Sequence, residues 1–350
     1  MTLQRPAGDQ PASRAPGSSG NPTMRDVAQH AGLSPMTVSR ALRDDPRVSP
    51  EAKTRVMTAV NALGYSRNEA ARNLRLGRSS GLVGLVVTNL ANPFYSQLAL
   101  GVEAMASEHG MRVMLGNSGE DVARERQLVH DFASRRLDGI VVVPVGSNHR
   151  HLNAAQQSGI PVVLAASPPV RFVADAVMLD DFGGTWEATH HLIKAQHRKI
   201  AFLGLQASTW TGSERFRGYS AALEEAGIQF DERIVSRQHR DVAAAERATL
   251  AMLDQEDPPT AVFAANNRNT IGAYRAIRAR RPDTALAGFD DFELADMLAL
   301  PLTVVKYDPE ELGRRAAELL CDRIDNPRPQ AEPAARRIVI QTELVEYRPQ

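Results

Sequence analysis

The stretch at residues 23–42, TMRDVAQHAGLSPMTVSRAL, decides how the front of this chain folds. Thr23 is a good N-cap for a helix, and Asp26 lies three residues on, near the positive end of that helix. Gly32 supplies the turn that ends the helix, and Ser34 then caps a second one, with a proline in its first turn. The pattern predicts two short helices that meet at a tight corner.

The second helix of this corner has one apolar face. Val38, Ala41 and Leu42 point inward at i, i+3 and i+4 spacing. The outer face then carries Pro35, Met36, Thr37, Ser39 and Arg40. Arginine donates to guanine edges or phosphates, hydroxyls bind phosphates, and methionine contacts thymine methyl groups. With the caps Thr23 and Ser34, these residues predict a recognition helix in a DNA major groove. The alternative is a helical hairpin that only packs against another part of the protein.

Two more helical patterns follow the corner. In VSPEAKTRVMTAVNALGY, Ser49 caps a helix with one apolar stripe that ends at Gly64, and this third helix is able to bury the inner faces of the first two. In NEAARNLRLGRSS, Asn68 caps a short helix that runs through Leu74. This last helix has too little apolar surface to fold alone, so we expect it to become ordered on binding.

Composition and charge limit the class of protein. The 350 residues are 43% hydrophobic and 23% charged, as in ordinary globular proteins. No apolar run approaches the roughly 20 residues that span a bilayer, and the Pro- and Ser-rich residues 1–21 predict a disordered tail rather than a secretory signal. The single cysteine, Cys321, excludes an internal disulfide framework. Residues 22–80 contain ten Lys and Arg against five Asp and Glu, in a chain of zero net charge. The N-terminal part is therefore basic and the rest of the chain acidic. A basic N-terminal part predicts a polyanionic partner.

From residue 81 onward, β-rich runs alternate with helical patterns. Runs such as GLVGLVV, DGIVVVP, KIAFLGL and TAVFAA are apolar throughout. Strands that alternate with helices predict βαβ units and parallel sheets, and strands this apolar are buried on both faces. The runs are too many for one sheet, so we predict an α/β body of two lobes. Ligands of such folds bind beyond the carboxyl ends of the strands, here in the cleft between the lobes.

These segments resemble the LacI/GalR family of bacterial transcription regulators. MRDVAQHAGLSPMTVSRAL, RVSPEAKTRVMTAVNALGY and NEAARNLR match its helix-turn-helix, third helix and hinge helix, and NPFYSQLALGVE, AGFDD and PEELGRRAAELL match its body. The resemblance implies a helix-turn-helix DNA-binding domain, a hinge helix and a body like a periplasmic sugar-binding protein. It also implies that Leu74 inserts into the minor groove at the operator centre and kinks the DNA. Arg72 and Asn73 lie beside Leu74 in the sequence, in the predicted helix that Asn68 caps.

We therefore predict four parts of the chain. They are a disordered tail at 1–21, the helix-turn-helix domain at 22–66, the hinge helix and linker at 67–80, and the effector-binding and dimerisation body at 81–350. By resemblance the chain crosses between lobes near 180, 308 and 335, which gives a first lobe of about 81–180 and 309–335 and a second of about 181–308 and 336–350. No heptad pattern follows, so we expect a homodimer.

Candidate ligand-binding residues follow the predicted strands. Phe94 and Tyr95 are able to stack on a sugar ring or a base. By resemblance, Arg215, Asn266 and Asp290 match the polar ligand-binding positions of the family, and an Arg–Asp pair suits vicinal hydroxyls. The alternative is that Arg215 and Asp290 only bridge the lobes. The predicted effector-binding set is Phe94, Tyr95, Thr211, Arg215, Arg240, Asn266, Asp290 and Tyr307.

Three departures from the family pattern bear on the charge of the ligand. Ala166 and Asn267 stand where many relatives carry aspartate. Arg240 falls near a position that is often aromatic in sugar-binding relatives. A pocket with two fewer carboxylates and one more arginine favours an anionic effector, such as a sugar acid or sugar phosphate.

The sequence thus predicts a dimeric regulator, a repressor of a carbohydrate uptake or catabolic operon, in the cytoplasm on the nucleoid and away from any membrane. Its partners are a near-palindromic double-stranded DNA operator and a small, sugar-like effector. No catalytic residue, metal or cofactor is expected, since His190, His191 and His197 lack the spacing of a zinc site. The alternative is a cytoplasmic carbohydrate-binding protein or an enzyme with the same body, against which the basic head argues.

Overall fold

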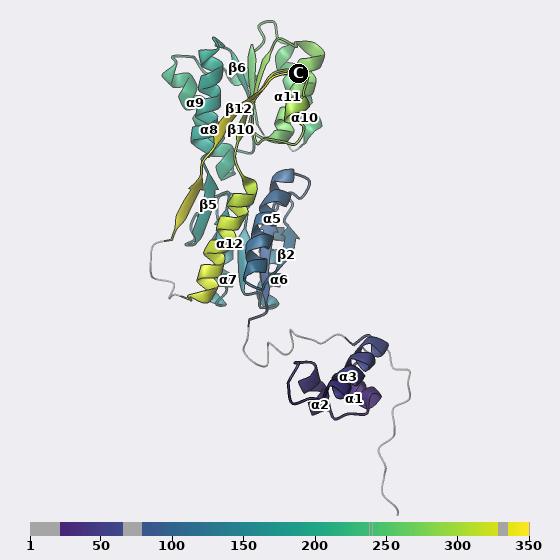
Figure 1. Cartoon of the computed structure of the whole chain (residues 1–350). Helices are drawn as coiled ribbons and strands as arrows, with labels where there is room; N and C mark the ends of the chain where they lie inside the picture. Colours follow the sequence, from purple (N-terminus) through teal and green to yellow (C-terminus); the bar gives the residue numbers. More distant parts are fainter. Residues whose placement is uncertain (1–21, 66–78, 238, 240, 328–334, 350) are drawn as a thin grey trace, which may run out of the picture. The chain divides into compact units, whose positions relative to one another are not determined.

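The structure is a computed structural model that describes residues 22–65, 79–237, 239, 241–327 and 335–349. The chain divides into two units, Met1–Arg78 and Ser79–Gln350, which we call the head and the body (Figure 1). Several predicted site residues lie outside the described residues: Asn68, Arg72, Asn73 and Leu74 of the hinge, and Arg240.

The described part of the head, residues 22–65, contains three helices: α1 (Met24–Ala31), α2 (Pro35–Ala41) and α3 (Pro50–Leu63). Thr23 and Asp26 form a capping box at the start of α1, in which the Thr23 backbone N–H donates to Asp26 Oδ2 at 2.7 Å. Ser34 Oγ accepts from the backbone N–H of Thr37 at 3.1 Å and so begins α2. The helix-turn-helix that the residue pattern predicts is therefore present.

The head closes around a small core made by all three helices. Its buried residues are Val27, Ala28, Ala31, Val38, Val56 and Ala59. Gly32 ends α1 in the left-handed conformation, with φ 62°, and a Cβ there would meet Arg55 Nη2 at 2.8 Å. Arg55 in turn donates to the carbonyl of Ala31 at 2.6 Å. The third helix thus holds the corner between the first two, and Met36 on the outer face stays 59% exposed.

The body contains two six-stranded sheets, each of which defines a lobe. The first lobe has the order β11-β5-β4-β3-β1-β2 and the second β12-β10-β9-β8-β6-β7. The first sheet consists of β1 (Leu82–Val87), β2 (Arg112–Asn117), β3 (Gly139–Val142), β4 (Val162–Ala165), β5 (Asp175–Leu179) and β11 (Arg337–Ile340). The second consists of β6 (Ile200–Leu203), β7 (Val235–Ser236), β8 (Ala261–Ala264), β9 (Ala285–Phe289), β10 (Leu302–Lys306) and β12 (Glu343–Tyr347). All neighbours pair in parallel except β10 and β12, which confirms the predicted α/β class.

Helices cover both faces of each sheet, which explains why the strands are so apolar. In the first lobe α5 (Pro93–Glu108) and α12 (Pro309–Asp325) pack together on one face (Figure 1), and α6 (Val122–Ser134) and α7 (Asn153–Gln157) cover the other. In the second lobe α8 (Asp181–Lys194) and α9 (Trp210–Glu225) lie on one face, and α10 (Val242–Leu253) and α11 (Asn267–Arg280) on the other. Short 3₁₀ helices occur at η1 (Arg150–Leu152), η2 (Glu232–Ile234) and η3 (Ala295–Met297). A Cβ at Gly101 would collide with the α12 backbone, so this glycine permits the close approach of α5 and α12.

The chain passes between the lobes three times: at 180, at 307–308 and at 341–342. The third passage differs from the predicted position near 335. Arg337–Ile340 pairs in parallel with β5, whereas Glu343–Tyr347 pairs antiparallel with β10. The position was predicted too early because β11 and β12 belong to different sheets but are separated by only two residues. The sequence RRIVIQTELVEYR therefore has the pattern of a single strand.

Asp175 joins β5 of the first lobe to α12 and to the segment before β11 through ion pairs. It lies at the start of β5, is 2% exposed, and accepts hydrogen bonds from Arg323 Nε at 2.8 Å and Arg336 Nη2 at 2.7 Å. Burial raises the pKa of the Asp175 carboxyl, but the bonds from Arg323 and Arg336 outweigh this effect and bring the pKa down to about 2. The ion pairs therefore stabilise the folded body.

We predict that Asp175→Asn lowers the free energy of unfolding of the body by about 2 kcal/mol near neutral pH, because Arg323 loses its anionic partner and Arg336 keeps only Asp322 among the described residues. Urea unfolding of the two proteins measures the difference. The carboxyl pKa is lower in the folded state, so the stabilisation is present above about pH 4 and is lost as the pH falls towards 2. An equal difference near pH 3 and pH 7 would contradict this assignment.

Candidate functional site

The second helix of the head offers a surface for nucleic acid. Pro35 and Met36 are exposed, and Thr37, Ser39 and Arg40 are half-buried. The hydroxyls of Ser34 and Thr37 lie 2.9 Å apart, and Thr23 Oγ1 donates to its capping partner at 2.7 Å. Thr23 and Ser34 therefore act first as helix caps. The Arg40 guanidinium makes no hydrogen bond to any residue that the structure describes, so its five donors are available to a ligand.

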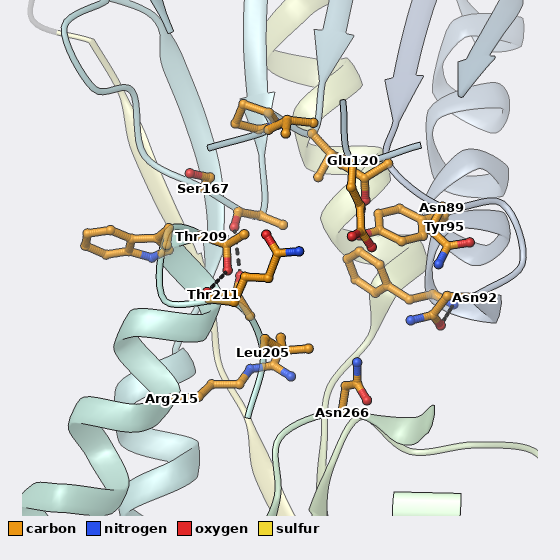
Figure 2. A pocket seen from close by; sticks show the side chains of 18 of the residues that line it. Asn89, Asn92, Tyr95, Glu120, Ser167, Leu205, Thr209, Thr211, Arg215 and Asn266 are labelled. Carbon is orange, nitrogen blue, oxygen red and sulfur yellow. Dashed lines mark hydrogen bonds between the residues drawn. The ribbon is translucent and has the colours of Figure 1, made fainter. Parts of the chain in front are cut away.

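A cavity of about 360 Å³ lies between the two lobes of the body. Its walls are the segments that follow strands of both sheets, where parallel α/β sheets bind ligands. The lining includes seven predicted effector-binding residues: Phe94, Tyr95, Thr211, Arg215, Asn266, Asp290 and Tyr307. Figure 2 shows Tyr95 on one wall, with Thr211 and Arg215 across the cavity.

Aromatic side chains form part of the first-lobe wall. Asn92 begins α5 by accepting the backbone N–H of Phe94 at 3.1 Å, which sets Phe94 and Tyr95 in the first turn. Their ring centroids lie 4.9 Å apart, edge to face, and Tyr307 lies 6.1 Å from Phe94. Thr88 Oγ1 donates to Tyr95 Oη at 2.5 Å, and burial raises the pKa of Tyr95 to about 12. Rings that are held in this way present a firm apolar surface to a ligand.

Arg215 of α9 forms the floor of the cavity and is 3% exposed. Its Nε donates to Asp181 Oδ1 at 2.8 Å, and its Nη1 donates to Ala265 O at 2.7 Å and to Asp290 Oδ1 at 3.1 Å. Its guanidinium carbon lies 3.5 Å from the ring centroid of Phe289. Burial alone would lower the pKa of Arg215, but Asp290 and Asp181 raise it above its ordinary value, so the group stays charged.

Two carboxylates share this one guanidinium. Burial raises the pKa of Asp181 to about 6 against the attraction of Arg215. Asp290 Oδ1 also accepts from Tyr307 Oη at 2.8 Å, which leaves Asp290 Oδ2 without a hydrogen bond from the described residues. Arg215 and Asp290 both belong to the second lobe, so the alternative that this pair bridges the lobes is wrong. The arrangement offers a fixed carboxylate oxygen to a hydroxyl of a ligand.

Between the residues that the structure describes, two side-chain hydrogen bonds join the lobes at the edge of the cavity. Asn267 Nδ2 donates to Asn92 Oδ1 at 3.0 Å, and Thr211 Oγ1 donates to Ala166 O at 3.4 Å. Since Asn92 Oδ1 also caps α5, the orientation of its amide is set and Asn267 has to be the donor. Asn267 is not among the residues that line the cavity. The inference that it removes a carboxylate from the pocket therefore does not hold.

Other polar residues of the cavity were not predicted from the sequence. They are Thr88, Asn89, Asn92, Glu120, Ser167, Gln206, Ser208, Thr209, Trp210, His239 and Arg268. Most of them follow β1, β2, β6 or β8, so the rule that found Phe94 and Asn266 would have found them if applied to every strand. His239 follows β7, a two-residue strand that is too short for a periodic signal.

His190 and His191, which lack the spacing of a zinc site, make separate contacts in the structure. The ring of His190 stacks on Trp186 with centroids 4.8 Å apart, and His191 Nε2 lies 3.7 Å from a carboxylate oxygen of Glu346. Within the described residues, no group of three His, Cys, Asp or Glu side chains is placed to hold a metal ion. In the same part of the chain, no helix has the length and apolar character to cross a membrane.

Comparisons with known proteins cover both the head and the body. The family described as "Bacterial regulatory proteins, lacI family" matches residues 23–68, and that described as "Periplasmic binding proteins and sugar binding domain of LacI family" matches residues 80–347. The HTH-type transcriptional regulator CelR of Thermobifida fusca is 34% identical in an alignment of 336 residues that covers 93% of this chain and 97% of CelR. The ribose operon repressor of Haemophilus influenzae is 31% identical over 87% of this chain and 92% of its own.

Two solved structures are similar over almost the whole chain. A complex of the transcriptional regulator CelR with cellobiose has a TM-score of 0.68 at 32% identity, over 93% of this chain and 98% of that one. The lac repressor dimer bound to operator and the anti-inducer ONPF has a TM-score of 0.76 at 25% identity, also over 93% and 98%.

We predict that Asn267→Asp opens the cavity in the absence of ligand. A carboxylate cannot donate to Asn92 Oδ1, so a hydrogen bond of about 1 kcal/mol is replaced by repulsion between two oxygens. Dyes on cysteines introduced at Val173 of the first lobe and Met297 of the second, 67% and 76% exposed, report the distance between the lobes by energy transfer. The native Cys321 is buried and does not interfere.

The matched control for this change is Asn148→Asp, an exposed residue outside the cavity whose Oδ1 accepts from a backbone N–H. Asn267→Ala is expected to fall between Asn267→Asp and the wild type. Equal transfer efficiencies in Asn267→Asp and Asn148→Asp would show that this hydrogen bond does not hold the lobes together.

Proposed function

The chain belongs to the LacI family of bacterial regulatory proteins, and on that premise we propose that it is a homodimeric repressor of a carbohydrate uptake or catabolic operon, controlled by a sugar bound in its body. Its relatives are transcriptional regulators that bind DNA. Similar structures support the sugar effector, the operator DNA and the homodimer: one contains CelR with cellobiose, and another contains a lac repressor dimer with operator DNA. The site of action is then the bacterial nucleoid.

In this proposal the exposed face of α2 reads one half of the operator. Arg40 and Met36 contact base edges in the major groove, and Thr37 and Ser39 bind phosphates. By family resemblance, two copies of the hinge segment insert Leu74 at the centre of a near-palindrome, supported by Asn68, Arg72 and Asn73.

The observation that carries the effector part of the proposal is the cavity between the lobes. The aromatic rings of Phe94 and Tyr95 belong to the first lobe, and the Arg215–Asp290 pair belongs to the second. A hydroxyl-rich ring is stacked and hydrogen-bonded at once only when the lobes are closed around it. The ligand therefore favours one arrangement of the body, and coupling to DNA of about 1–3 kcal/mol is usual for two linked sites.

Selection from a pool of random duplexes with the intact protein, at near-physiological salt, tests the proposal. We expect enrichment of a near-palindrome with a flexible pyrimidine–purine step at its centre. Arg40→Ala should weaken binding to the selected operator by about 5- to 150-fold more than binding to random duplex, because a base contact is lost.

Arg25→Ala removes one exposed charge from α1 and is the control, which should weaken binding to all duplexes alike. Weak, salt-sensitive binding that enriches no sequence, both with and without added sugars, would contradict a sequence-specific regulator.

A further inference from the structure

Glu120 lies on the first-lobe side of the cavity, between β2 and α6. Its backbone is left-handed, with φ 63°, directly after Gly119 with φ 64°. A left-handed residue other than glycine costs about 1–2 kcal/mol, and such strain concentrates at ligand sites. Ala166 and Asp290, with φ 58° and 68°, line the same cavity. The backbone is thus held in costly conformations at three places around the space that a ligand would fill.

The Glu120 carboxylate has no hydrogen-bond or ion-pair partner among the described residues. It lines the same cavity as Tyr95, and its charge adds to the effect of burial in raising the pKa of that tyrosine. Figure 2 shows Glu120, Tyr95 and Asn89 on the same side of the cavity. An unpaired carboxylate at this wall is available to a ligand.

The other charged lining residues that the structure describes are Arg215, Asp290 and Arg268. Arg215 is already shared by Asp181 and Asp290. Burial lowers the pKa of His239, which favours its neutral form. Among the described lining residues, Arg268 is the one cation without an ion pair. Within the described lining, carboxylate oxygens from both lobes, at Glu120 and Asp290, thus face the single unpaired guanidinium of Arg268.

We infer that Glu120 makes this cavity selective for uncharged, hydroxyl-rich ligands over their acid and phosphate forms. The inference rests on the proposed function, in which a sugar is the effector. The two oxygens of a carboxylate accept hydrogen bonds from neighbouring hydroxyls, whereas an anionic group in the same place is repelled. The expectation of an anionic effector counted on Asn267, which does not line the cavity, and it did not include Glu120.

The test uses matched pairs of carbohydrates and the intact protein. The pairs are cellobiose with cellobionate, glucose with glucuronate, ribose with ribose 5-phosphate, and fructose with fructose 1-phosphate. Thermal shift identifies the pairs that bind, and calorimetry gives the Kd of each member. We expect the wild type to bind the neutral member about 10-fold or more tightly, a difference of about 1.4 kcal/mol.

Glu120→Gln keeps the size and one acceptor oxygen but removes the charge, so it should reduce this preference to about 3-fold or less, mainly by tighter binding of the charged member. Glu108→Gln, at the exposed end of α5 and outside the cavity, should keep the wild-type preference. Both residues are exposed, so an unchanged melting temperature without ligand is the check on folding.

A preference that is the same in Glu120→Gln and Glu108→Gln, or a wild type that prefers the charged members, would overturn the inference and leave a sugar-controlled regulator intact. If no member of any pair binds, the sugar effector of the proposed function fails and the inference fails with it. The selection of operator DNA separates these outcomes, because it needs no carbohydrate assignment.

Discussion

One buried guanidinium connects the segments that build the second-lobe side of the cavity. Arg215 of α9 donates to Asp181 of α8, to the carbonyl of Ala265 directly after β8, and to Asp290 directly after β9. Removing one partner from a buried ion pair costs about 3–5 kcal/mol, because a charge is left without compensation in the interior. The same group therefore holds the lobe together and fixes Asp290 for a ligand, so fold and site depend on one interaction.

The contacts between the lobes are of a different kind. The two side-chain hydrogen bonds at the edge of the cavity, Asn267–Asn92 and Thr211–Ala166, are neutral, and each is worth about 1 kcal/mol. Weak, neutral contacts leave open and closed arrangements close in free energy, which is the condition under which a ligand shifts the population of a two-state element. The Arg215 ion pairs hold the second lobe rigid, whereas the two lobes are held to each other only weakly. A ligand bound between the lobes is therefore able to change their arrangement.

Much of this structure could be predicted from local patterns in the sequence. Thr23, Ser34 and Ser49 cap the three helices of the head as their types and spacing indicate, and the apolar runs become strands buried on both faces. The third passage between lobes was misplaced, because the apolar alternation continues through two strands that belong to different sheets.

The ligand-binding residues could be predicted where they follow a parallel strand in the sequence. Residues after strands, such as Phe94 and Asp290, were found because carboxyl ends of parallel strands meet at one edge. Glu120 follows β2 in the same way, and it was missed because the rule was not applied to that strand. The direction of the Asn267 amide depends in turn on the helix cap made by Asn92, a contact between residues 175 positions apart.

The central claim is that a ligand in the body controls DNA binding by the head. Its most direct test is the operator affinity of the intact protein, measured by fluorescence anisotropy as the sugar that raises the melting temperature is titrated in. We expect saturating sugar to change the operator Kd by about 5- to 150-fold in one direction, and operator DNA to change the sugar Kd by the same factor. An operator Kd that stays constant at saturating sugar would contradict the account.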